Sequence, residues 1–210
     1  MQFKTVRPEV PPGGLAALAQ VALSPEHQRG LEEAAKAAGG PPAWKHRKQA
    51  EARDLLALAQ IAPRLQVGWV DLATDLRALL LLRVPVPCRP GAAGDLVIEP
   101  QAVLGLTYPQ AALRQPLPGY SFLQVLAPAD VWHANVAFGP VRPLCLGAAL
   151  PANVRVKELV LMAYGALSMQ TVQIDEQDAA GVLNVEAAQW WQKNTARVPL
   201  SRAPFLSPDD

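Results

Sequence analysis

The chain has 210 residues, of which 50% are hydrophobic and 18% are charged. This length suits one compact domain, or one domain with a helical extension, and the composition excludes a wholly disordered chain because it supplies a sizeable core. Lys and Arg number 19 against 18 Asp and Glu, a net charge of +1. A balance so close to zero excludes a global attraction for nucleic acid or for an anionic membrane, so neither is expected as a partner.

The sequence also indicates a location. No apolar run approaches the roughly 20 residues of a membrane-spanning helix. In segment 1–14, a glutamate and prolines occupy the place where a secretory signal needs its apolar centre. We therefore expect a cytoplasmic protein. Its two cysteines, Cys88 and Cys145, form no CxxC pair, so the sequence predicts neither a zinc site nor a disulfide framework.

The amino-terminal part is predicted to be helical after an irregular lead over residues 1–23. Ser-Pro-Glu at 24–26 is typical of a helix start, with an N-cap serine, proline at the first helical position and an acid at the positive end of the helix dipole. Gly-Gly at 39–40 ends this helix, and the apolar spacing predicts a second helix over 43–62.

Basic residues crowd the start of the second helix, where the dipole least favours cations. They are Lys45, His46, Arg47 and Lys48. Two interpretations are open: a solvated basic face, or a docking surface for an acidic partner.

From residue 64 to about 128 the period changes to that of strands. Turn-prone residues separate four apolar or alternating runs, and such short connections favour an antiparallel meander. Pro85 and Pro87 remove ladder donors and predict a strand end or an edge at that point. The four strands are expected at 65–72, 76–86, 95–107 and 120–127.

After residue 150 the pattern is helical again. Asn153 is the predicted N-cap of a helix, and a further helix around 184–194 carries Trp190 and Trp191. The buried stripe of the first of these helices is Val156, Leu159, Val160, Ala163 and Leu167.

This order of elements predicts the fold class. Helices, a strand meander and helices again make an α+β architecture, with a four-stranded antiparallel meander flanked by helices. We divide the chain into an amino-terminal extension with one helix, residues 1–42, and a main domain, residues 43–210.

The stretch 132–147, WHANVAFGPVRPLCLG, is the first candidate for a functional site. Nucleotide-binding, zinc-protease and serine-hydrolase motifs are absent from the sequence. The stretch is too apolar for disorder, and ordered loops of this length are usually functional. Within it, Cys145 is either a small buried hydrophobe or an active-site thiol.

The order His-Ala-Asn at 133–135, a loop, Cys-Leu-Gly at 145–147 and then a helix resembles the active-site region of ubiquitin-conjugating enzymes. In that family His-Pro-Asn precedes a Cys-Leu-Asp or Cys-Leu-Gly element. Leu-Thr-Tyr-Pro at 106–109 is also similar to the stretch before that motif, and the likeness covers roughly residues 43–195. Two departures are Ala134 in place of the proline, and a spacing from Asn135 to Cys145 about two residues longer than in the family.

The resemblance implies an activity. Cys145 would accept a ubiquitin-like protein as a thioester from an adenylating activating enzyme and pass it to an amine on a target protein. No metal or organic cofactor is implied, because the activating enzyme consumes the ATP. Such a carrier needs an accessible sulfur and a docking surface, which Lys45, Arg47 and Lys48 would supply for the activating enzyme.

The resemblance also implies roles for the other site residues. Asn135 would donate to the oxyanion or hold the loop in shape. His133 is expected to bond backbone in the loop, with direct participation as the alternative. Asp178 would orient or deprotonate the incoming amine, with Asp175 and Glu176 as competitors; a merely solvated acidic loop is equally open.

The Ala-, Leu- and Pro-rich composition and the divergent motif are more similar to the bacterial conjugating proteins, some of which act in antiphage defence. Two rival functions stay open. One is a catalytically inactive scaffold of the same fold that binds a ubiquitin-like protein. The other is a cysteine hydrolase that uses Cys145 with His133, although no third member or oxyanion motif is evident. Cys88 is expected to be structural.

Overall fold

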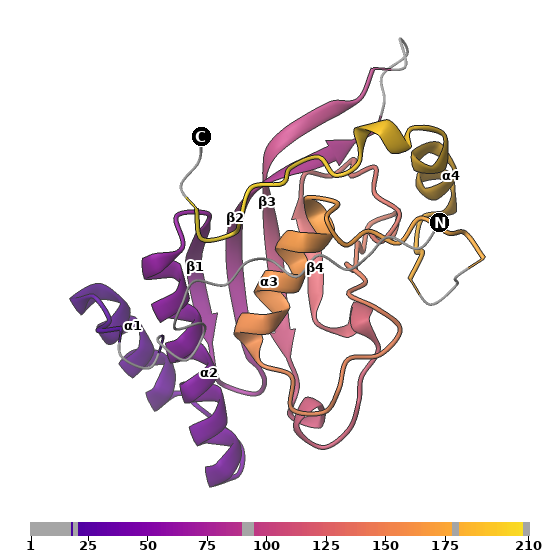
Figure 1. Cartoon of the computed structure of the whole chain (residues 1–210). Coiled ribbons are helices and arrows are strands. Elements are labelled where there is room, and N and C mark those ends of the chain that lie inside the picture. The colour runs from indigo at the N-terminus through magenta and orange to yellow at the C-terminus, as the bar shows by residue number, and fades with distance from the viewer. Residues whose placement is uncertain (1–17, 19–20, 90–94, 178–180, 208–210) are drawn as a thin grey trace.

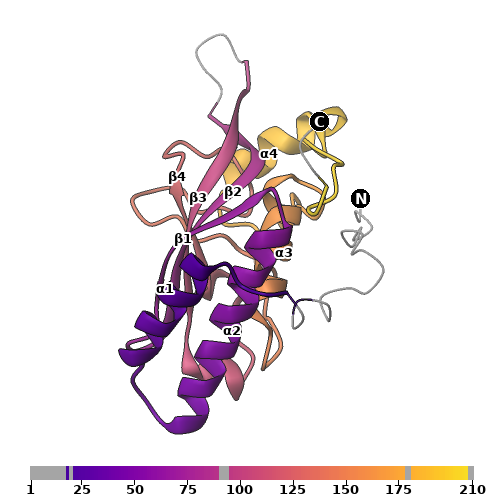
Figure 2. The same ribbon diagram turned by 90° about the vertical axis from the view of Figure 1, so that its left-hand side faces the viewer.

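The computed structural model describes residues 18, 21–89, 95–177 and 181–207. The predicted α+β fold is confirmed: a four-stranded antiparallel sheet in the order β1-β2-β3-β4 carries helices α2 and α3 on one face (Figures 1 and 2). The helices are α1 (Pro25–Lys36), α2 (Pro42–Ile61), α3 (Val156–Leu167) and α4 (Val185–Lys193). The strands are β1 (Leu65–Asp71), β2 (Leu76–Cys88), β3 (Val97–Tyr108) and β4 (Leu123–Ala127).

The helix starts follow local capping chemistry. Ser24 is the N-cap of α1 as predicted, and its side chain accepts a hydrogen bond from the backbone N–H of His27. The predicted cap of α3 is wrong: Arg155 is the N-cap, and the Glu158 carboxylate accepts from its N–H at 2.9 Å. Asn153 lies two residues earlier at φ 67°, a left-handed conformation that asparagine tolerates.

The sheet buries one face against α2 and α3. Along β2, buried Leu80 and Leu82 alternate with the exposed Leu79 and Arg83. The buried leucines pack with apolar residues of α2 and α3 in the main core. The whole predicted stripe of α3 is buried there as well. The burial along β2 therefore alternates as expected for a strand with one face against the core.

The prolines of β2 mark a change in strand pairing, close to what the sequence predicts. β2 runs past both of them to Cys88, but β1 accompanies it only as far as the pair Leu65–Leu82. The β2–β3 register also shifts in a bulge between Arg83 and Val86. Pro85 thus lies where β2 no longer has β1 beside it.

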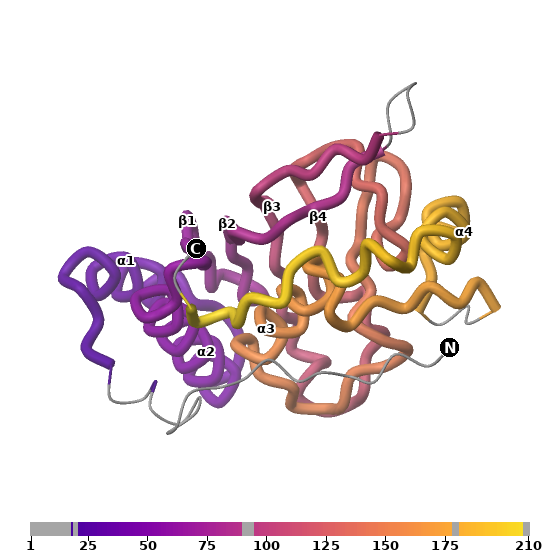
Figure 3. Tube along the Cα trace, turned by 45° about the horizontal axis from the view of Figure 1, so that its top comes forward, coloured from indigo at the N-terminus to yellow at the C-terminus, as the bar shows by residue number. Residues whose placement is uncertain are grey.

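Both ends of the described chain pack on the helices. Leu18, from the predicted irregular lead, is 1% exposed, and Arg53 of α2 donates to its carbonyl at 3.3 Å. At the other end, the segment after α4 runs back along α3 (Figure 3). Tyr164 of α3 donates to the Ala203 carbonyl at 2.7 Å, and Phe205 packs edge-on against the Tyr164 ring.

A second, smaller apolar cluster lies under α4 and positions the candidate site. It joins the chain around Trp132 and Ala134 to the segment that follows α3 and to α4 itself. The members of the cluster are Trp132, Ala134, Met169, Val172, Ile174, Val182, Ala187, Ala188 and Trp191.

Within the described ranges, no helix has both the length and the hydrophobicity needed to cross a bilayer.

Candidate active site

The predicted loop 132–147 is ordered because its backbone is paired on both sides. The Cys145 N–H donates to the Asn135 carbonyl at 2.8 Å, and Val136 pairs with Leu144. On the other side, the Leu144 N–H donates to the Leu123 carbonyl of β4 at 2.9 Å. The segment that leads to Cys145 thus continues the sheet beyond β4, and its course is fixed.

A glycine contact closes the site after the cysteine. The Gly119 N–H donates to the Gly147 carbonyl at 3.2 Å, and a Cβ at Gly119 would lie 2.1 Å from that oxygen. Only glycine therefore fits at this position. The sequence did not predict this contact. The neighbouring Tyr120 is 50% exposed.

The Cys145 thiol is less accessible than the resemblance implies. The residue is 4% exposed, and Sγ donates to the Gly147 carbonyl at 3.3 Å. The expectation that this sulfur is presented to solvent is wrong for this conformation, because the turn at Gly147 folds back over it. Chemistry at Sγ requires the side chain to rotate away from the Gly147 carbonyl.

Asn135 holds the loop that carries the candidate acids. Its amide nitrogen donates to the carbonyls of Gln173 at 2.9 Å and Gly181 at 2.6 Å. Its amide oxygen accepts from the Gln173 N–H at 3.1 Å. Both amide hydrogens are therefore engaged, and the side chain holds the chain at Gln173 and Gly181 rather than the loop 132–147 that it was expected to shape. Donation to an oxyanion would require one of these bonds to open.

Ala134, which replaces the proline of the resembled motif, fixes the approach to α4. Its carbonyl accepts from the N–H groups of Leu183 at 2.8 Å and Asn184 at 3.0 Å. Asn184 is the N-cap of α4. Two residues before Ala134, the Trp132 carbonyl accepts a hydrogen bond from the indole N–H of Trp191 at 2.8 Å. The segment 132–135 thus joins α4 to Cys145, whose N–H donates to the Asn135 carbonyl.

His133 is fully buried between backbone groups. Its Nδ1 accepts from the Asn135 N–H at 3.0 Å, which leaves Nε2 as the donor to the Ala166 carbonyl at 2.8 Å. Burial lowers the pKa of His133 to about 4, so the ring is neutral near pH 7. Both ring nitrogens are occupied, as the backbone-bonding role requires, and neither is available as the base of a cysteine hydrolase.

The burial of His133 predicts a loss of stability in mild acid. His133 binds a proton near pH 6.5 in the unfolded chain but only near pH 4 in the folded one. Between these values unfolding takes up a proton, so the free energy of unfolding decreases as the pH is lowered. Lowering the pH from 7 to 5 should therefore reduce the free energy of unfolding by about 2 kcal/mol through this residue. NMR titration of the ring and urea unfolding at both pH values measure the effect. A midpoint near 6.5 for the His133 ring would contradict it.

The acidic candidates belong to a loop tied to Asn135. Asp178 lies outside the described residues. The Asp175 carboxylate accepts from the Gln177 N–H at 3.1 Å, within the loop. Glu176 accepts from the Gln189 side chain of α4 at 2.7 Å. Both carboxylates are in exposed residues, and Asn135 bonds the chain before and after them, at Gln173 and Gly181.

Cys88 has the environment of an inert thiol. It is 1% exposed at the end of β2, where Cys88 pairs with Val131. Burial, together with the nearby Asp130 charge, raises the pKa of Cys88 to about 12. A thiol that stays protonated and covered is a poor nucleophile, which agrees with the structural role predicted for it.

The expected basic docking surface is not present as such. Lys48 is fully buried, and its ammonium donates to the carbonyls of Gly39 at 3.0 Å, Leu72, and Thr74 at 2.8 Å. The ammonium also lies 5.5 Å from the ring centre of Trp44. Burial lowers the pKa of Lys48, although Asp75 and Asp71 oppose this. The interpretation as a solvated basic face is therefore wrong for Lys48, because its ammonium is enclosed by three carbonyls from other segments.

Arg47 is also engaged internally, in a buried cluster that the sequence did not predict. Its Nε lies 2.8 Å from Glu51, and Arg155 Nε lies 2.6 Å from the same carboxylate. The second Glu51 oxygen accepts from the Val156 N–H at 2.9 Å. Burial raises the pKa of Glu51 while this bond and the two guanidinium groups oppose it. The cluster fixes the start of α3 against α2, and Lys45 is left as the accessible lysine of the expected set.

No group of three or more His, Cys, Asp or Glu side chains within the described ranges is placed to hold a metal ion. Comparison of the chain with protein-family models, curated proteins and solved structures finds no match.

Proposed function

We propose that the protein is a conjugating enzyme of the ubiquitin-conjugating type, with Cys145 as the acyl carrier. One observation carries this proposal: the cysteine follows a four-stranded meander on a segment hydrogen-bonded to Asn135, and α3 comes directly after it. This is the order of elements that the resemblance implies, with the motif residues in contact. By the same resemblance, the protein would act in the bacterial cytoplasm, with antiphage defence as one setting.

The reaction has two acyl transfers. First, the Cys145 thiolate attacks the thioester carbonyl of a ubiquitin-like protein on an activating enzyme; the new C–S bond forms and the activating enzyme's thiolate leaves. Then a target amine attacks the Cys145 thioester, the amide forms and the Cys145 thiolate leaves. The amine must lose a proton, and the acids of the loop held by Asn135 are the candidate acceptors.

Within this scheme, His133 and Asn135 have supporting roles. His133 and Asn135 connect the segment beside Cys145 to the loop that carries the acids. The cysteine side chain must exchange its bond to the Gly147 carbonyl for the incoming thioester. Gly147 has φ 131°, a conformation that glycine adopts readily, and leads into the exposed Ala148 and Ala149.

A second function, a scaffold of the same fold that binds a ubiquitin-like protein without catalysis, is favoured by two observations. Cys145 is only 4% exposed, and the Asn135 amide hydrogens are both engaged. In a scaffold the thiol would stay against the Gly147 carbonyl throughout. The two functions differ in whether the native thiol exchanges acyl groups.

Thioester exchange with a defined probe tests the proposal. A glycine-terminated peptide, as its 2-mercaptoethanesulfonate thioester, is incubated with the native protein, and intact mass reports acylation. We expect one acyl group on the unaltered chain and on Cys88→Ala, at least about tenfold faster than on Cys145→Ala. Added lysine should then discharge the acyl group.

Two results would decide against the carrier. Acylation of Cys145 only after denaturation supports the scaffold, because the thiol is then present but closed in the folded state. Equal acylation of Cys145→Ala and the unaltered chain would remove Cys145 from the reaction. Cys88→Ala is the matched control, since it deletes the other buried thiol of the chain.

A further inference from the structure

The candidate thiol is covered by a short piece of chain that another segment holds in place. Residues 146–149, here called the cover, follow the cysteine, and residues 117–119, here called the clamp, pair with the cover from outside. The Gly119 N–H donates to the Gly147 carbonyl at 3.2 Å, and the Leu146 N–H donates to the Gly119 carbonyl at 3.3 Å. Two backbone hydrogen bonds thus fasten the cover to the clamp.

The clamp also fixes the chain at the far end of the cover. Leu117 and Leu150 exchange two backbone hydrogen bonds, at 3.2 Å and 2.8 Å, and Leu150 is 5% exposed. Between these anchors the cover consists largely of small residues, namely Gly147 and the exposed Ala148 and Ala149. Small exposed side chains bury little apolar surface, so the cover is held mainly by its backbone bonds to the clamp.

The Gly147 carbonyl links the clamp to the thiol. This oxygen accepts from the Gly119 N–H and also from Cys145 Sγ, which lies 3.3 Å away. Gly147 has φ 131°, which lets the chain turn back at this carbonyl. When the cover leaves the clamp, the carbonyl that lies on the sulfur must leave with it. One oxygen atom therefore couples the position of the cover to the accessibility of Sγ.

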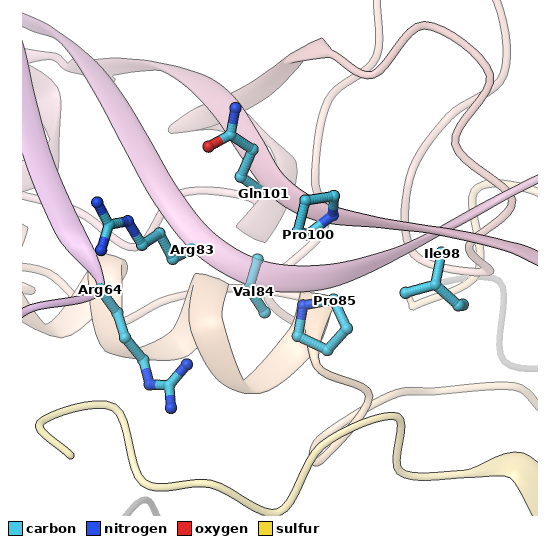
Figure 4. Close-up of a pocket in the computed structure, with 7 residues that line it drawn as sticks. All are labelled: Arg64, Arg83, Val84, Pro85, Ile98, Pro100 and Gln101. Carbon is cyan, nitrogen blue, oxygen red and sulfur yellow. The ribbon is translucent and has the colours of Figure 1, made fainter. Parts of the chain in front are cut away.

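A separate hollow of about 510 Å³ lies at the bulge between β2 and β3 and does not reach the cover (Figure 4). Its lining residues belong to these two strands and to Arg64, just before β1, and none of them is part of the cover, the clamp or segment 132–147. This hollow therefore gives no route to the sulfur.

We propose that the cover is a gate on Cys145 and that the contact of Gly119 with Gly147 holds it shut. This inference rests on the proposed function, since a gate matters only where the thiol reacts. An incoming thioester must wait for the cover to leave the clamp, so the observed rate is the rate of the open state multiplied by the open fraction. Between transfers, the closed gate keeps the thiol away from small oxidants and alkylating agents.

Alkylation of Cys145 by iodoacetamide, in which the thiolate displaces iodide, measures the open fraction, and Gly119→Ala should raise it. The added Cβ would lie 2.1 Å from the Gly147 oxygen, so this carbonyl must move away from the clamp. In a Cys88→Ala background, which leaves one thiol, we expect Gly119→Ala to speed alkylation at least about tenfold. Gly30→Ala is the matched control, because a Cβ there meets no atom within 4 Å outside the backbone of its own helix; its rate should stay within about twofold.

Hydrogen exchange tests the gate with the clamp unaltered, and so decides even if circular dichroism shows that Gly119→Ala does not fold. Opening frees the Gly119 N–H and the Cys145 thiol together. The protection factor of this amide should therefore equal, within about threefold, the factor by which folding slows alkylation relative to the urea-unfolded chain.

Three results would overturn the gate. They are an unchanged alkylation rate in folded Gly119→Ala, a mismatch of more than about tenfold between the two factors, and factors that both equal the global unfolding constant. The test also separates the gate from the acyl carrier, because iodoacetamide requires no ubiquitin-like protein. Failure of thioester exchange with gated alkylation removes the carrier alone, and thioester exchange at the same rate in folded Gly119→Ala removes the gate alone.

Discussion

Replacing Lys48 with Met is expected to lower the free energy of unfolding by about 3 kcal/mol. Methionine matches the length and apolar stem of the lysine but donates no hydrogen bond. The ammonium now bonds the carbonyls of Gly39, Leu72 and Thr74 in a fully buried place. Removing it leaves these oxygens short of a charged donor and releases the α1–α2 connection from the β1–β2 turn.

The matched control is Lys45→Met, three residues earlier on α2. Lys45 is only partly buried, so its replacement should change the free energy of unfolding by less than about 0.5 kcal/mol. Urea unfolding followed by far-ultraviolet circular dichroism measures both variants. Equal stability of the two variants would mean that the three hydrogen bonds of the Lys48 ammonium contribute nothing to the free energy of unfolding. The comparison also limits any docking role, because a loss of binding in a Lys48 variant would reflect damage to the fold.

Local sequence signals were sufficient where the structure depends on local chemistry. Ser24 caps α1 through an atom three residues away, and the alternation in β2 requires only that one face of the strand be buried. Asn153 failed as a cap for the opposite reason. Its N–H donates to the Ala112 carbonyl, a distant group that fixes the chain in a left-handed turn. Arg155 and Glu158 then form the cap.

The site illustrates the same limit. The order of His133, Asn135 and Cys145 was visible in the sequence, and the structure does bring Asn135 and Cys145 into contact. Burial of Cys145 was one of the two alternatives that the sequence left open, and the residue is 4% exposed; the contact of Gly119 with Gly147 beside it was not predicted. The buried charges escaped prediction for a similar reason: Lys48 and Glu51 find their partners on segments far away in the chain.

Asn135→Ala is expected to cost about 3 kcal/mol of unfolding free energy, so that its effect on stability precedes any effect on catalysis. The side chain makes three hydrogen bonds, to the Gln173 carbonyl, the Gln173 N–H and the Gly181 carbonyl, at a residue that is 3% exposed. Alanine removes all three and leaves buried backbone groups without this partner. The loop between 173 and 181 should then open independently of the rest of the chain.

Hydrogen exchange and urea unfolding separate this structural role from a catalytic one. The Gln173 amide, which donates to the Asn135 oxygen, should lose its protection in Asn135→Ala. Gln189→Ala is the control, because its exposed side chain bonds Glu176 on the same loop and should cost less than about 0.5 kcal/mol. An Asn135→Ala variant with unchanged stability and protection but slower discharge of the Cys145 acyl group would place the amide in the chemistry. Lost protection together with slower discharge would instead mean that Asn135 acts through the loop it holds.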